Sequence, residues 1–263
     1  MYTYSKEHLD FLQKKKRKKH MILFLQIIII IAFLVIWEIL AKLKIINTFL
    51  FSCPSEVFKC MISLYKDNNL FMHIGITVYE TLISFILANV IGIVVATLLW
   101  WNQTFAKVLD PYLTIINSLP KVALGPLIII WVGASINSII FMALLINTII
   151  SIINIYNGFI NTDENFITLL KTFKATKWQL YKKVIIPSNL SNIISNFKIN
   201  ISMSLIGVIM GELLVSKMGL GYLIMYGSQV FNIGLIITSV FILGIISYLM
   251  YYMICLLEKK LMR

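Results

Sequence analysis

Long apolar runs, interrupted by short polar segments, dominate the chain. A helix needs about 20 apolar residues to cross a bilayer, whereas a strand of a membrane barrel would alternate polar and apolar positions. Runs of the first kind predict membrane-spanning helices at roughly residues 21–41, 73–101, 108–132, 137–160, 193–215 and 233–257. The pattern therefore predicts an all-α integral membrane protein with about six transmembrane helices, because a helix satisfies its own backbone groups in lipid.

The polar segments divide the chain into parts. A basic tail covers residues 1–20, and a transmembrane domain covers residues 21–263. The sequence KKKRKK at residues 14–19 precedes the first apolar run, but no small-residue cleavage site follows, so we expect a retained anchor helix and not a removed signal peptide. A lysine-rich loop at about residues 162–190 separates the predicted fourth and fifth spans.

Composition and charge agree with a membrane protein. The chain is 59% hydrophobic and 13% charged, which leaves too little polar surface for a water-soluble globule of this length. A formal net charge of +12 would suit a nucleic-acid partner, but the lysines gather at the ends of apolar runs, where they set membrane topology. We therefore expect a lipid bilayer and no nucleic acid as the partner.

Three basic segments predict the orientation in the membrane. The tail, the lysine-rich loop and the ending LEKKLMR fall on one side if the chain crosses six times. Since basic loops stay inside, the pattern predicts a multi-pass membrane protein with both termini in the cytoplasm. The abundance of Ile, Asn and Lys is typical of an AT-rich bacterial genome, so we expect the bacterial plasma membrane. The first predicted outer loop disagrees, because it carries Lys42, Lys44, Lys59 and Lys66.

The sequence offers little for catalysis, metal binding or cofactor binding. Three cysteines and three histidines are scattered without a CxxC pair, so neither a metal site nor a disulfide framework is expected. The P-loop pattern GxxxxGK[ST] does not occur. A membrane-embedded enzyme, one alternative, would need acids or histidines at one depth, whereas Glu38, Asp110 and the other intramembrane acids are dispersed.

The lysine-rich loop is unlike the segments around it. Its core, KTFKATKWQLYKKVIIP at residues 171–187, contains five lysines and no acid. Its apolar residues are spaced as in two short helices with a break near Thr176 and Lys177, and Pro187 is expected to stop or bend the chain. A loop that only set topology, as in a stand-alone channel or scaffold, would explain the lysines but not this ordered apolar surface.

The segment TLLKTFKATKWQLYKKVIIP resembles the EAA loop of ATP-binding-cassette (ABC) importer permeases, with Pro187 thirteen residues after the position of the family's glycine. Further stretches are similar to the nitrate/sulfonate/taurine branch: FSCPSEVF at 51–58, SLPKVALGPLIIIWVG at 118–133 and GELLVSKMGLGYLI at 211–224. The sequence TVYETL resembles the subgroup for pyrimidine precursors of thiamine. The resemblance covers about residues 35–263 and implies a type I importer permease fold.

The resemblance also implies a role for the loop, which in this family docks onto a separate ATPase. Thr168, Leu169 and Leu170 stand where the family has E-A-A, and Lys174 replaces the glycine. Lysine rarely adopts positive φ, so we expect ordinary dihedrals in this turn. The implied coupling residues are Leu169, Leu170, Lys171, Thr172, Phe173, Lys174, Ala175 and Pro187.

The resemblance implies an assembly of two permease copies forming a homodimer, two ABC ATPase subunits that bind ATP and Mg²⁺, and an extracytoplasmic solute-binding protein. No cofactor is expected in this chain. The solute stays open among sulfonates, nitrate, a thiamine pyrimidine precursor and riboflavin.

Two acids at membrane depth are candidates for the translocation path, because a charge there costs about 2.5–3.5 kcal/mol. The resemblance implies that Glu80 stands where many members of the family have arginine, and Glu212 lies late in the fifth predicted span. The alternative for both is a hydrogen bond or ion pair that orients helices. Pro120 is a third candidate for the path.

Prolines and glycines predict two irregular segments. Pro120, Gly125 and Pro126 are expected to break the third predicted span locally. Gly219 and Gly221 are expected to form a tight turn or a re-entrant bend before the last span.

Overall fold

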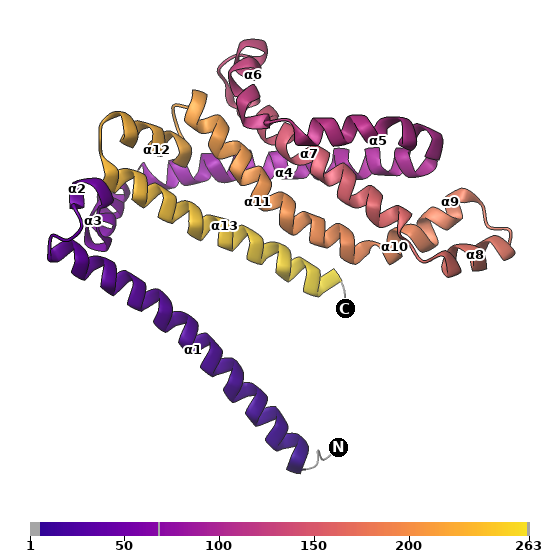
Figure 1. Cartoon of the computed structure of the whole chain (residues 1–263), viewed down its shortest axis with the longest axis horizontal. Coiled ribbons are helices and arrows are strands. Elements are labelled where there is room, and N and C mark those ends of the chain that lie inside the picture. The colour runs from indigo at the N-terminus through magenta and orange to yellow at the C-terminus, as the bar shows by residue number, and fades with distance from the viewer. Residues whose placement is uncertain (1–5, 68, 262–263) are drawn as a thin grey trace. The chain divides into compact units, whose positions relative to one another are not determined.

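The computed structural model describes residues 6–67 and 69–261, and every regular element within these ranges is a helix (Figure 1). Residues 1–5 of the predicted tail and the last two residues lie outside the described ranges. The chain forms two compact units, residues 1–62 and 63–263. The predicted all-α membrane fold is confirmed.

The first unit consists of helices α1 (Lys6–Lys42) and α2 (Thr48–Phe51) and most of α3 (Pro54–Lys66). Helix α1 runs without a break through residue 20, and its part from Lys14 to Lys42 contains an apolar stretch long enough to cross a membrane. Glu38 accepts a hydrogen bond of 3.1 Å from the backbone N–H of Ser55, which fixes the start of α3 near Pro54.

The second unit contains four more helices that are long and apolar enough to span a membrane: α4 (Leu70–Trp101), α7 (Ile136–Ile160), α11 (Leu190–Val215) and α13 (Ile233–Leu261). Helices α4, α7 and α11 pack on one another, and α13 packs on α11. A Cβ added at Gly207 would lie 2.5 Å from Cα of Ala143, so the glycine allows α11 and α7 to approach backbone to backbone.

The third predicted span is broken. Helix α5 (Gln103–Ser118) is followed by a 3₁₀ turn, η1 (Lys121–Leu124), and helix α6 (Gly125–Val132), and the two halves are bent by 81°. Pro120 directly precedes η1. Proline is favoured at such a helix start because its missing N–H would have no partner there. The predicted span over residues 108–132 corresponds to this bent pair, which has the length and composition of one broken span or a re-entrant loop, and the predicted local break is confirmed. The described chain has five straight candidate spans, or six with the bent pair.

Helix α12 (Leu220–Gln229) was not predicted as a helix. The expected turn is present, because Gly219 has a φ of +105°, which favours glycine. The chain then turns into α12, which packs on α11 and α13.

Asparagine and serine side chains connect α4, α7 and α11 inside the second unit. Asn200 donates to Asn89 at 2.6 Å, and Asn147 donates to Ser204 at 2.6 Å. All four residues are buried. Such bonds are worth about 0.6–2 kcal/mol each in a membrane, so they help to fix how the three helices pack.

Candidate functional site: the lysine-rich loop and the buried carboxyls

The lysine-rich loop folds into two short helices, as predicted. Asp163 accepts a hydrogen bond of 2.9 Å from the N–H of Asn165 and caps α8 (Glu164–Thr172). Thr176 and Gln179 form a capping box at the start of α9 (Lys177–Leu180). The polar side chains at these two positions therefore set where each helix begins.

The turn between the two helices corrects one expectation. Lys174 has a φ of +53°, not an ordinary dihedral. The N–H of Ala175 donates to the carbonyl of Leu170 at 3.1 Å, and the N–H of Lys174 donates to that of Lys171 at 2.9 Å. This pair of bonds is a Schellman motif, which requires a left-handed residue after the helix. The motif forms with lysine in the glycine position, although a left-handed lysine costs about 1–2 kcal/mol.

The second helix continues towards α11 through a wider turn. A π-helical turn, η2 (Tyr181–Ile185), leads into α10 (Ile186–Ser188), and the chain turns at Asn189 before α11 begins. Pro187 lacks an N–H and would clash with a carbonyl four residues earlier in a regular helix. The wider π turn lies at that place, so the helix extends one residue beyond Pro187 before it ends.

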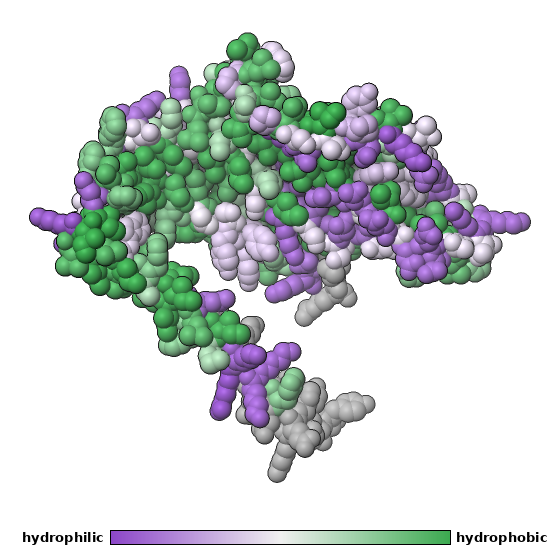
Figure 2. Space-filling view, viewed as in Figure 1, coloured by the Kyte–Doolittle hydropathy of each residue, from purple (hydrophilic) through white to green (hydrophobic). Residues whose placement is uncertain are grey.

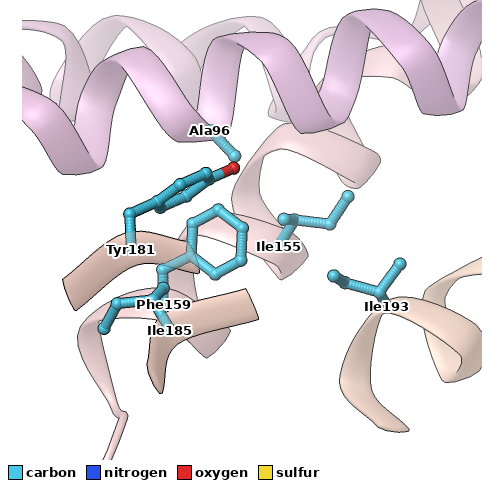
Figure 3. Packing of buried hydrophobic residues seen from close by; sticks show 6 residues of the cluster. All are labelled: Ala96, Ile155, Phe159, Tyr181, Ile185 and Ile193. Atoms are coloured by element: carbon cyan, nitrogen blue, oxygen red, sulfur yellow. The ribbon is translucent and has the colours of Figure 1, made fainter. Parts of the chain in front are cut away.

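Tyr181 attaches the loop to the membrane helices. Its ring packs edge-on against Phe159 of α7, with centroids 6.0 Å apart, and its hydroxyl lies 2.7 Å from the hydroxyl of Thr97 on α4. Figure 3 shows the Tyr181 hydroxyl pointing towards the helix that carries Ala96. The buried cluster around it consists of Ala96, Ile155, Phe159, Tyr181, Ile185 and Ile193.

Lys177 makes a second attachment to the end of α4. Its Nζ lies 5.7 Å from the ring centroid of Trp100 and 5.5 Å from that of Trp101, and it donates to the Trp101 carbonyl. A lysine over an aromatic face contributes about 0.5–2 kcal/mol. Trp178 packs on the same group, with its ring 5.8 Å from that of Tyr181. Sequence reasoning missed this group, although two adjacent tryptophans at a helix end were its signal.

The outer surface of the loop is apolar. The side chain of Phe173 is 75% exposed and that of Leu169 is 55% exposed, and Phe166 and Trp178 are exposed too. Leu170, by contrast, is half-buried. Exposed apolar residues grouped in this way are typical of a surface that contacts another protein or the membrane.

The remaining predicted coupling residues support the shape of the loop. Lys171, Lys174 and Pro187 are exposed, and Ala175 is half-buried. The Thr172 hydroxyl donates to the carbonyl of Leu169 at 2.6 Å. The apolar surface is therefore bordered by lysines, which favours a partner that carries acidic groups.

Glu212 and Glu80 lie together in the interior of the second unit, at the other end of α4. Glu212 accepts hydrogen bonds from the Thr77 hydroxyl at 2.6 Å and from the N–H of Gly221 at 2.5 Å. Glu80 is fully buried, and neither of its carboxyl oxygens has a hydrogen-bond donor among the described residues. Glu80 interacts with Glu212. Two ionised carboxylates in contact repel each other, so a proton on one of them would supply the missing donor.

The glycine-rich turn before α12 closes over Glu212. The N–H of Gly219 donates to Nδ1 of His73 at 2.9 Å, and the N–H of Leu220 donates to the Thr77 hydroxyl at 2.9 Å. A Cβ on Gly219 would lie 2.3 Å from Oε1 of Glu212, so a larger residue would displace the carboxyl. The turn thus ties α12 to α4 and α11.

The structure brings two of the three candidate path residues together, Glu80 and Glu212, but not Pro120. Glu80 and Glu212 are buried inside the unit, whereas Pro120 is exposed at the break between α5 and η1. The neighbouring Lys121 donates to Asn117 at 3.1 Å and to the carbonyl of Ile146 at 3.3 Å. Among the described residues, no group of three or more His, Cys, Asp or Glu could hold a metal ion.

The long apolar helices and the connecting lysine-rich loop place the chain among the helical integral membrane proteins. Residues 88–263 match the family described as "Binding-protein-dependent transport system inner membrane component", and the chain belongs to this family. It is therefore a membrane-spanning permease subunit of an ATP-driven, binding-protein-dependent importer, and ATP is hydrolysed in a separate subunit. Membership replaces the alternatives of a stand-alone channel and a membrane-embedded enzyme.

Similar proteins agree with this assignment. The formylaminopyrimidine transport permease protein ThiX of Halalkalibacterium halodurans is 29% identical over 229 residues, which cover 87% of this chain and 91% of that protein. SsuC of Bacillus subtilis, named for aliphatic sulfonates transport, is 25% identical over 228 residues, or 87% of this chain and 83% of that protein. An inward-facing structure of the MetNI methionine ABC transporter shares the fold with a TM-score of 0.64 at 20% identity, covering 74% of this chain and 96% of that one.

Proposed function

We propose that the lysine-rich loop couples nucleotide binding and hydrolysis in a partner ATPase to alternating access through this permease. The observation that carries the proposal is the exposed apolar surface of Leu169 and Phe173 on a loop that is itself firmly attached to α4 and α7. A loop with both properties can bind a partner and pass that partner's movement on to the membrane helices.

The attachments indicate how movement is transmitted. Tyr181 and Lys177 hold the loop to the end of α4. Helix α4 is in turn joined to α11 through Asn89 and through the Thr77–Glu212 bond. Access alternates because nucleotide in the ATPase and loaded binding protein outside stabilise different states of the same helices.

The proposed assembly contains two copies of this chain, two ATPase subunits that bind ATP and Mg²⁺, and one extracytoplasmic solute-binding protein. Both termini and the lysine-rich loop face the cytoplasm, as the lysines at their positions favour. Glu212 connects the helices that flank the path, Glu80 lies beside Glu212, and Pro120 lies at the path itself.

The transported solute is small. Relatives are named for a formylaminopyrimidine and for aliphatic sulfonates, and we propose a solute of one of these kinds, with nitrate as a further candidate. The binding protein selects the solute, and the permease provides the path.

The coupling assignment can be tested by placing a charge on the exposed surface. Leu169→Asp and Phe173→Asp should each weaken co-purification with the ATPase and lower transport by about tenfold or more, because a charge in an apolar interface loses its solvation. Ser191→Asp adds the same charge at an exposed position in the first turn of α11 and should have little effect. Undiminished association and transport in both loop variants would overturn the assignment.

A further inference from the structure

A polar cavity of about 490 Å³ lies between α7 and α11, next to the lysine-rich loop. Hydrophilic residues gather over α7 and α11 towards the α8–α9 end of the unit (Figure 2). Three asparagines in the last turns of α7 and just after it are three or four residues apart, so they share one helix face. Three more at the start of α11 have the same spacing. The six are Asn154, Asn157, Asn161, Asn189, Asn192 and Asn196.

Helix packing explains only part of this set. Asn196 donates to Ser151 at 3.0 Å, and Asn154 donates to Asn196 at 3.2 Å. Asparagines that bond across helices in this way stabilise their packing. Asn157 and Asn161 are exposed, and neither side chain makes a hydrogen bond to another described residue.

The cavity keeps hydrogen-bonding groups free. Of the six side-chain oxygens, only that of Asn196 accepts a hydrogen bond from a described residue. Gly158 forms part of the wall, and a Cβ there would lie 2.0 Å from Nδ2 of Asn192 and 2.8 Å from Oδ1 of Asn189. The missing side chain therefore leaves both amide groups room at the cavity wall.

The lining carries no charge, because it consists of the six asparagines with Gly158, Ser195 and Ile199. Lys198, on the same helix, is paired with Glu258 at 2.6 Å. Proteins bind anions such as sulfonates or phosphates with arginine or lysine. A carboxamide instead offers a donor beside an acceptor, and it pairs through two bonds with an edge of the same kind, as asparagine does with the amino group and ring nitrogen of adenine.

We propose that this cavity binds an uncharged molecule with a hydrogen-bond donor beside an acceptor, such as a primary amide or an amino-substituted ring with an adjacent ring nitrogen. The proposal rests on the proposed function, since it makes the cavity a station for the solute near the loop. Asn189 donates to Thr162 at 2.7 Å and to the carbonyl of Ile185 in the π turn at 2.9 Å. A movement of the loop would therefore change the shape of the cavity.

Binding to the whole transporter tests the proposal. The permease with its ATPase, in lipid nanodiscs without the binding protein, is titrated with 4-aminopyrimidine and with methanesulfonate, and binding is followed by saturation-transfer NMR. We expect saturable binding of 4-aminopyrimidine and none of methanesulfonate. Equal binding of both probes, or binding of neither, would overturn the proposal.

Variants locate the site. Asn157→Leu with Asn161→Leu should weaken 4-aminopyrimidine binding about tenfold or more, because two hydrogen-bonding groups are removed. Asn157→Ala is the milder variant if the double change impairs folding, and about a fivefold loss is expected. Asn137→Leu replaces an exposed asparagine at the far end of α7 and should leave binding unchanged. Unchanged binding in the cavity variants would contradict the assignment.

The same experiments separate this inference from the coupling role of the loop. Loss of coupling in Leu169→Asp, with intact 4-aminopyrimidine binding, supports both proposals. If the unchanged protein does not bind 4-aminopyrimidine, and the cavity variants still transport solute and co-purify with the ATPase, the cavity proposal is refuted and the coupling proposal stands. If, with no probe binding, the cavity variants also change their oligomeric state, the asparagine-lined face of α7 and α11 would instead be a contact between two copies of the chain.

Discussion

The two ends of α4 are held in different ways. At the loop end, Trp100 and Trp101 receive Lys177 and pack near Tyr181, while Phe173 of the same loop stays exposed. At the other end, the interactions of Glu212 are all internal. One end thus combines firm attachment with a free apolar surface, and the other only connects helices. The comparison supports our proposal that the loop end contacts a partner, whereas the carboxyl end maintains the fold.

The largest effect is expected from Glu212→Ala. The change leaves the Thr77 hydroxyl and the N–H of Gly221 without their acceptor, and each buried orphan group costs about 1–3 kcal/mol. We expect a clear fall in the thermal unfolding temperature of the purified permease.

Glu80→Gln is the matched variant for that experiment. Both carboxyl oxygens of Glu80 are buried without a hydrogen-bond partner in the described part of the chain, and glutamine replaces one of them with an NH₂ group that can donate a hydrogen bond. The unfolding temperature should therefore change little or rise. A larger loss for Glu80→Gln than for Glu212→Ala would contradict the view that Glu212 is the residue that ties the helices together.

At the loop end, Lys177→Met should weaken coupling more than folding. The variant keeps the length of the side chain but removes the charge over Trp100 and Trp101 and the bond to the Trp101 carbonyl, a loss of about 1–2 kcal/mol. Transport per ATP hydrolysed should fall several-fold while the ATPase still co-purifies. Lys182→Met, at an exposed lysine of the same loop, is the control, and an equal effect there would show that general charge matters and not the attachment.

Tyr181→Phe is a smaller change at the same attachment. It removes the hydroxyl that lies 2.7 Å from Thr97 and leaves the ring packing, so a cost of about 1 kcal/mol is expected. Hydrogen exchange of the α9–α10 backbone should become faster, and unchanged exchange there would mean that the bond does not hold the loop.

The smallest effect is expected from Lys174→Gly, and its sign is opposite. Glycine adopts the left-handed conformation of this turn without steric strain, so the loop should be stabilised by about 1 kcal/mol or less. Slower hydrogen exchange at Ala175 is the readout. Faster exchange would show that the lysine side chain supports the turn in another way.

The sequence predicted most of the membrane helices because apolar runs report directly on lipid contact. The predicted spans at 73–101, 137–160 and 193–215 lie within a few residues of α4, α7 and α11. The break near Pro120 was also predicted, because a proline changes the backbone locally. Features of this kind depend on neighbouring residues alone.

The missed features depend on residues that are distant in sequence. Lys177 meets Trp101 across 76 positions, and Asn200 meets Asn89 across 111. No local pattern pairs them. The turn at Lys174 was predicted wrongly because the argument considered the cost of positive φ alone and not the two backbone bonds that the turn gains.

Photo-cross-linking tests the central claim most directly. Phe173 and Phe231 have matched exposures of 75% and 74%, and each is replaced in turn by a photoreactive phenylalanine analogue in cells that contain the whole importer. If the loop docks on the ATPase, the analogue at position 173 cross-links to the ATPase subunit and the one at position 231, between α12 and α13, does not. An ATPase cross-link from position 231 and none from position 173 would contradict the account.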